Sequence, residues 1–131
     1  DVPDPFDPFG ITGGADAAGA IERLDSLLLT GPPGGTIVQF GNLLLARLLE
    51  TRGETSRALG ALRRRRYFMG PPVYLSSYLR EEGRLASVTG DRDGAIRAYQ
   101  HYLALRRDPE PELRPQVDEV RKELAKLLAE R

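Results

Sequence analysis

The sequence has no cysteine and only one histidine among its 131 residues. Without cysteine there are no disulfide bonds, no thiol catalysis and no zinc site with cysteine ligands. The single histidine, His101, has no second histidine or cysteine with which to hold a metal, and no Ser-His-Asp arrangement is recognisable around it. We expect His101 to be a surface or interhelical side chain, and we predict no metal, no cofactor and no enzymatic activity.

Net charge is also lacking, because 19 lysine and arginine residues balance 19 aspartate and glutamate residues. Such a chain has no overall field that would attract nucleic acid or an anionic membrane, so any electrostatic recognition must be local. The longest apolar runs, such as residues 43–46, are far too short to cross a bilayer. We therefore predict no nucleic acid partner and no membrane span.

The residues that are present are those of a soluble globular domain, with 40% hydrophobic and 29% charged side chains. The first residue is Asp1 rather than methionine. We therefore expect a processed product or a piece of a longer protein. Cytoplasmic and processed extracytoplasmic locations both fit this composition.

The chain repeats itself at a period in the high thirties. Three segments align by their helical spacing and by a proline at or near the end: residues 19–33, 57–72 and 94–109. The small residue near each helix start is Ala20, Ala58 or Ala95, with steps of 38 and 37 residues. A repeat of this length with helical spacing inside it predicts stacked helical hairpins.

Partner helices are expected between and after the aligned segments. Apolar side chains recur three and four residues apart over residues 36–52 and 73–89, and again over 112–131. Gly53 and Gly90 follow the first two of these helices, where a residue in the left-handed conformation commonly ends a helix. No strand-period pattern of any length appears, so the fold is predicted to be all-α.

One stretch carries a family pattern, in which a glycine of the first helix is followed by a Gly-Asp turn, a small residue, an aromatic residue and a final proline. The matching residues are Gly83, Gly90, Asp91, Ala95, Ile96, Tyr99, Leu103, Asp108 and Pro109. This pattern resembles the tetratricopeptide repeat. The match is good over residues 72–109, fair over 36–72 and thin over 15–33, and Glu82 and Tyr102 depart from it.

The resemblance implies antiparallel helical hairpins stacked as a short α-solenoid of about six helices, with an extended N-terminal arm. The predicted parts are an arm (1–14) and a repeat domain (15–131) made of a lone helix (15–33), two hairpins (36–69 and 72–108) and a capping helix (111–131). Gly83 and Ala95 would let two helices approach closely, and Tyr99 would fill the gap to the next hairpin. The alternative is a generic antiparallel helical bundle.

The resemblance also implies a concave groove, lined by the first helix of each hairpin, in which a peptide lies. The residues placed there are Phe40, Leu43, Arg47, Glu50, Ser77, Arg80, Arg84 and Ser87. Arg47, Arg80 and Arg84 would then hold an acidic peptide by charge-assisted hydrogen bonds. Alternatively, these arginines pair with Glu50, Glu81 and Glu82 and only keep the face soluble.

Two other basic or glycine-rich features have simpler interpretations. The four arginines of residues 63–66 fan around a helix axis, because successive residues turn by about 100°. We expect them to lie along a hairpin surface with their heads in water. Residues 11–14 and 31–35 are rich in glycine but lack the lysine of a phosphate-binding loop, so both are predicted to be loops.

The N-terminal arm contains two Asp-Pro-Phe triplets, and we expect Phe6 and Phe9 to anchor it on its own hairpins or in a neighbouring molecule. The helix that opens the array lacks a partner, so Leu24, Leu27 and Leu28 need cover. Three functions follow: a non-enzymatic scaffold that binds a peptide segment or a neighbouring subunit, a structural subunit that assembles head to tail into an oligomer or filament, or the C-terminal docking portion of a larger bacterial signalling or regulatory protein.

Overall fold

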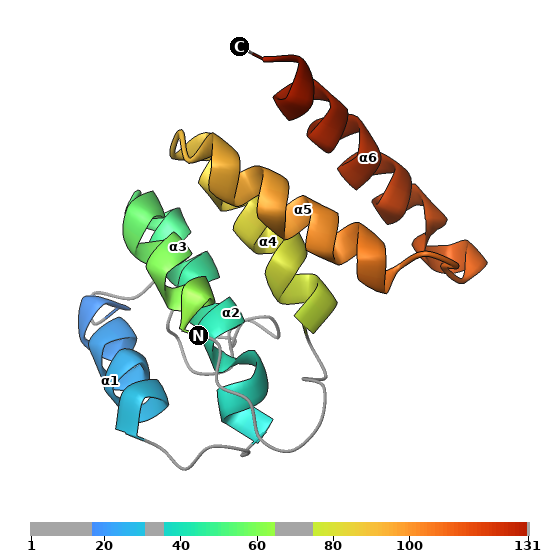
Figure 1. Ribbon diagram of the computed structural model, residues 1–131. Coiled ribbons are helices and arrows are strands. Elements are labelled where there is room, and N and C mark those ends of the chain that lie inside the picture. Colours follow the sequence, from blue (N-terminus) through green and yellow to red (C-terminus); the bar gives the residue numbers. More distant parts are fainter. Residues whose placement is uncertain (1–16, 31–35, 65–74, 131) are drawn as a thin grey trace, which may run out of the picture. The chain divides into compact units, whose positions relative to one another are not determined.

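The computed structural model describes residues 17–30, 36–64 and 75–130 (Figure 1). Within these ranges it contains six α-helices, one short 3₁₀ helix and no strand. The helices are α1 (Ala17–Thr30), α2 (Thr36–Thr51), α3 (Thr55–Arg63), α4 (Leu75–Val88), α5 (Arg92–Leu105) and α6 (Arg114–Ala129), with η1 (Pro111–Leu113) before α6. The prediction of an all-α fold is confirmed for the described residues.

The chain divides into two compact units, Asp1–Pro72 and Val73–Arg131. The first contains α1, α2 and α3, and the second contains α4, α5 and α6. None of the described helices is both long enough and apolar enough to cross a membrane. The predicted stacking of the hairpins into one solenoid stays a prediction.

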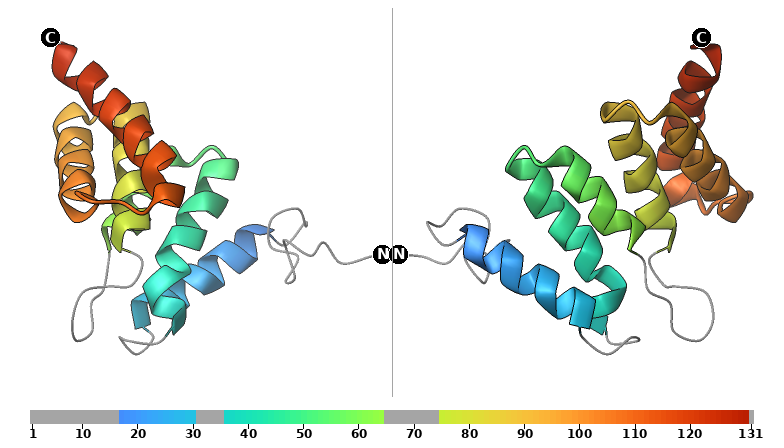
Figure 2. Two further views of the ribbon diagram at one scale, coloured as in Figure 1. Left: turned by 90° about the vertical axis from the view of Figure 1, so that its right-hand side faces the viewer. Right: turned by 60° about the vertical axis from the view of Figure 1, so that its left-hand side comes forward.

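In the first unit, α1 packs on α2, and α2 lies beside α3 (Figure 2). The α2–α3 turn is closed by hydrogen bonds from the Gly53 N–H to Glu50 and from the Glu54 N–H to Leu49. Gly53 has a φ of 79°, a backbone conformation that side chains disfavour, so its predicted role as a helix terminator is confirmed. The core consists mainly of Ile21, Leu28, Leu45, Leu48, Leu49, Leu59 and Leu62.

Only part of the apolar surface of α1 is covered. Leu28 is buried against Gly41 of α2, where a Cβ would overlap its side chain. Leu24 is half-buried, and Leu27 is 47% exposed. Of these three leucines, only Leu28 is fully buried, in the contact between α1 and α2.

In the second unit, α4 and α5 form the corresponding hairpin. Gly90 has a φ of 86° in the turn, and the carboxylate of Asp91 accepts a hydrogen bond from the Gly94 N–H at 3.0 Å. That contact satisfies one of the backbone donors that a helix start leaves without a partner. The Gly-Asp pair of the sequence therefore ends one helix and begins the next.

The last helix, α6, packs on α5 through Val117, Val120 and Leu127. Its end is held by Arg92 of α5, which donates from Nε to the Leu127 carbonyl at 2.9 Å and from Nη2 to the Glu130 carbonyl at 3.1 Å. Carbonyls at a helix C-terminus have no partner within the helix. An arginine from the neighbouring helix supplies one here, which fixes α6 along α5.

Candidate binding pocket

The residues predicted to line a groove fall on one helix of each unit. Phe40, Leu43, Arg47 and Glu50 lie on α2, and Ser77, Arg80, Arg84 and Ser87 lie on α4. Phe40, Leu43, Glu50 and Arg80 are half-buried, whereas Arg47, Ser77, Arg84 and Ser87 are exposed. In the second unit, Arg80, Arg84 and Ser87 meet at one pocket, and Ser77 is outside its lining.

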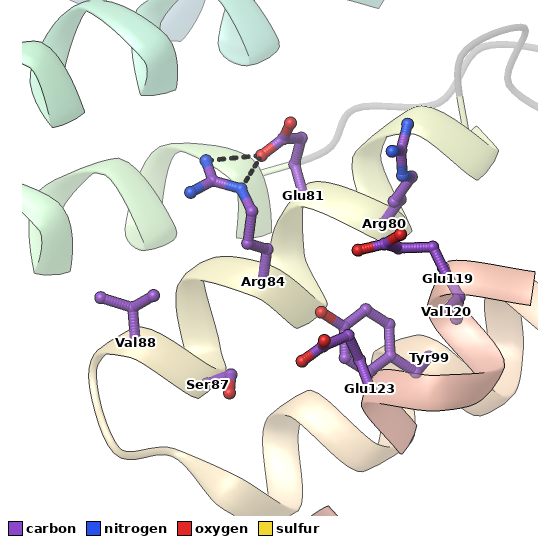
Figure 3. Close-up of a pocket in the computed structure, with 9 residues that line it drawn as sticks. All are labelled: Arg80, Glu81, Arg84, Ser87, Val88, Tyr99, Glu119, Val120 and Glu123. Carbon is purple, nitrogen blue, oxygen red and sulfur yellow. Dashed lines mark hydrogen bonds and ion pairs between the residues drawn. The ribbon is translucent and has the colours of Figure 1, made fainter. Parts of the chain in front are cut away.

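The pocket has a volume of about 350 Å³ and opens to the surface between three helices (Figure 3). Its lining consists of Arg80, Glu81, Arg84, Ser87 and Val88 from α4, Tyr99 from α5, and Glu119, Val120 and Glu123 from α6. Two of these lining residues, Glu119 and Glu123, are glutamates of α6. Their spacing of four residues places them on one side of α6, but only the packing of α6 turns that side to the pocket.

Tyr99 is at the floor of the pocket and is 4% exposed. It is positioned by Gly83, because a Cβ at Gly83 would overlap the Tyr99 ring. The predicted close approach of α4 and α5 at Gly83 is therefore confirmed. The other half of that prediction, a gap to the next hairpin filled by Tyr99, stays a prediction.

The hydroxyl of Tyr99 is held in its neutral form. Burial, the largest cause, and the carboxylate of Glu123 raise its pKa, which is about 12. Arg84 acts in the opposite direction, since a positive charge favours the phenolate. The floor of the pocket is therefore an uncharged phenol over the whole physiological pH range.

The neutral phenol predicts a stability difference at high pH. Because the folded pKa of about 12 exceeds the ordinary value of 10, the stabilisation is complete below pH 10 and is lost as the pH rises through 12. We expect wild type to lose up to about 2 kcal/mol more than Tyr99→Phe between pH 9.5 and 12. Urea unfolding at several pH values measures this difference, and parallel profiles for the two proteins would refute it.

The charges around the pocket are mixed rather than basic. The guanidinium of Arg84 lies 2.7 Å from the carboxylate of Glu81, and its Nε donates a hydrogen bond at 2.9 Å. This is the pairing that the sequence offered as the alternative to an acidic ligand. Glu123 contacts Lys126 at 3.3 Å. The pocket therefore contains two arginines and three glutamates.

One of the four arginines of residues 63–66, Arg64, has partners on two other helices of the first unit. Nη1 of Arg64 lies 2.6 Å from Oδ1 of Asp25 on α1, and Nη2 donates to the buried amide oxygen of Asn42 at 3.0 Å. Oδ1 of Asp25 accepts no hydrogen bond, so its contact with Arg64 is an ion pair only. Arg57 contacts the other oxygen of Asp25 at 3.4 Å. Arg64 therefore links three helices, whereas Arg63 is exposed.

Several predicted features fall outside the described residues. These are the arm with Phe6 and Phe9, the glycine-rich residues 11–14 and 31–35, and the arginines at 65 and 66. His101 is exposed on α5. Among the described residues there is no group of three histidine, aspartate or glutamate side chains that could hold a metal ion.

A scan against models of protein families, a search of curated proteins and a search of solved structures each found no match to this chain.

Proposed function

We propose that the chain is a non-enzymatic scaffold that binds a peptide segment of another protein in the pocket of the second unit. The observation that carries this proposal is the open pocket of about 350 Å³ between α4, α5 and α6. This volume is at the lower end of the range for ligand sites, about 300–1,000 Å³. It suits one or two side chains of a peptide that continues over the surface on either side.

The lining favours recognition over chemistry. Arg80, Glu81, Arg84 and Glu123 carry donors and acceptors of both signs around the ring of Tyr99. An extended peptide presents backbone N–H and C=O groups as well as side chains, so it offers partners for both. All these lining residues lie on helices, which hold a binding site more firmly than loops do.

We further infer that the helices form repeats of tetratricopeptide type. The buried positions of α2 and α4, the first helix of each hairpin, support this inference. Counted at a shift of 37 residues, the buried positions of 41–49 on α2 and 78–86 on α4 coincide. Thus Ala46 of α2 corresponds to Gly83 of α4, and both are buried small residues.

The second helices and the turns support the same inference. Ala58 and Ala95 are each the fourth residue of their helix and each 0% exposed. In both turns the glycine N–H bonds to the carbonyl three residues earlier, and the next N–H bonds to the carbonyl five residues earlier. Two hairpins with the same turn and the same buried rows are expected of a tandem repeat.

The proposal is tested by selecting peptides from a displayed random library on the full chain. Ser87 is exposed at the pocket, so Ser87→Trp should fill the entrance without disturbing the core. We expect the selected peptides to bind this variant at least about tenfold more weakly, a loss of about 1.4 kcal/mol. Isothermal calorimetry measures the affinities.

The matched control is Gln100→Trp, which places the same side chain at an exposed position of α5 outside the pocket. Its affinity for the selected peptides should equal that of wild type. If no peptide is enriched, or if both tryptophan variants bind as wild type does, the pocket is not a peptide site and the proposal is wrong.

A further inference from the structure

The charges of the pocket do not cancel, and their imbalance indicates what kind of side chain it holds. The contact of 2.7 Å between Arg84 and Glu81 offsets one positive and one negative charge. The remaining charged side chains of the lining are Arg80 of α4 and Glu119 and Glu123 of α6. The excess at the pocket is therefore negative, although the chain as a whole is neutral.

The two glutamates form a pair of carboxylates on one wall. They are one helical turn apart on α6 and both line the pocket, and Figure 3 shows Glu123 beside the ring of Tyr99. Glu123 also contacts Lys126 at 3.3 Å, but Lys126 lies outside the lining of the pocket. Its side chain is 71% exposed, so water and ions screen its charge more than they screen charges inside the pocket.

The pKa of Tyr99, at the floor of the pocket, is affected by the same excess of negative charge. Among the charged neighbours of Tyr99, Glu123 has the largest effect on its pKa and raises it, while the effects of Arg84 and Arg80 are smaller and opposite. The neighbour that acts most strongly on the floor is thus a carboxylate. A ligand cation placed there gains electrostatic energy, and a ligand anion loses it.

We propose that the pocket binds a lysine or arginine side chain of the partner peptide, with its charged head between Glu119 and Glu123 and its aliphatic stem against Tyr99. A tyrosine ring attracts such a cation further through its π face. Arg80 then faces the backbone carbonyls of the same peptide. This assignment rests on the proposed function. The ligand side chain is positively charged, whereas the arginines of α4 alone suggested an acidic peptide.

The probes are two capped pentapeptides, acetyl-GGRGG-amide and acetyl-GGEGG-amide, titrated into the isotope-labelled full chain and followed by NMR. We expect saturable shifts of the Tyr99 and Glu123 amides with the arginine peptide, and an affinity at least about tenfold lower for the glutamate peptide. The preference should shrink in 0.5 M salt, because ions screen charges near the surface.

The decisive variant is the double substitution Glu119→Gln with Glu123→Gln, which should weaken binding of the arginine peptide at least about tenfold. The matched control is Glu112→Gln with Asp118→Asn, which removes two negative charges from exposed positions outside the pocket. It should leave the affinity within about twofold, and circular dichroism checks that both variants fold.

Binding of the glutamate peptide as tight as that of the arginine peptide would overturn the proposal. So would an arginine affinity that does not depend on the two carboxylates, or the absence of any saturable shift with the arginine peptide. These results leave the proposed function standing if library peptides still lose affinity with Ser87→Trp. The two failures are therefore distinguishable.

Discussion

Replacing Gly83 by alanine should lower the free energy of unfolding by about 1–3 kcal/mol. The added Cβ would overlap the ring of Tyr99, and both residues are buried between α4 and α5. The two helices must therefore separate or the ring must leave its rotamer. Urea unfolding followed by circular dichroism measures the loss.

The matched control is Gly60→Ala on α3. Gly60 is also inside a helix, but it is exposed, and a Cβ there would have no heavy atom within 4 Å. This variant should be more stable than wild type by about 0.5–1 kcal/mol, because alanine favours the helix over glycine. Equal effects of the two substitutions would contradict the close approach at Gly83.

Replacing Leu62 by alanine should lower the free energy of unfolding by about 2–5 kcal/mol. Leu62 of α3 is 0% exposed, so the substitution removes buried methyl groups and leaves a cavity in the core of the first unit. The loss combines the transfer of those groups from water with the contacts that the cavity wall forfeits. Denaturant unfolding measures it.

Leu27→Ala is the control in the same unit. Leu27 of α1 is 47% exposed, so its truncation should change the free energy of unfolding by less than about 1 kcal/mol. If Leu27→Ala lowers the free energy of unfolding as much as Leu62→Ala does, Leu62 is not a core residue of the first unit and the prediction is wrong.

Gly83 also connects stability to binding. Because it sets the position of Tyr99, any shift at Gly83 moves the floor of the pocket. Arginine-peptide affinity should therefore fall in Gly83→Ala, whereas Gly60→Ala should bind as wild type. The same substitution pair thus tests whether the pocket depends on the helix contact beneath it.

Much of the local structure was predictable from the sequence because its causes are local. Apolar side chains three and four residues apart define the helices, and glycines that must adopt a positive φ end two of them at Gly53 and Gly90. The close helix approach at Gly83 was expected from the tetratricopeptide resemblance, whereas the contact of Gly83 with the ring of Tyr99 was not, because Tyr99 was expected at the next hairpin.

The candidate pocket was predictable only in part. Arg80, Arg84 and Ser87 of α4 were expected at a binding surface, and they do line the pocket. The sequence left open whether Arg84 binds a ligand or pairs with a neighbour, since Glu81 precedes it by three residues on the same helix face. The role of Arg64 in joining Asp25 and Asn42 was not visible either, because those residues are distant in the chain.

By itself, the sequence determined that the chain folds into helices and where two of their turns fall, because both depend on spacing within a few residues. Only the tertiary structure decided that Glu119 and Glu123 join Arg80 around Tyr99. The side chains that share a pocket depend on how α6 packs on α5, and no pattern within α6 contains that information. The sign of the pocket's charge, and with it the proposed ligand, follows from that packing.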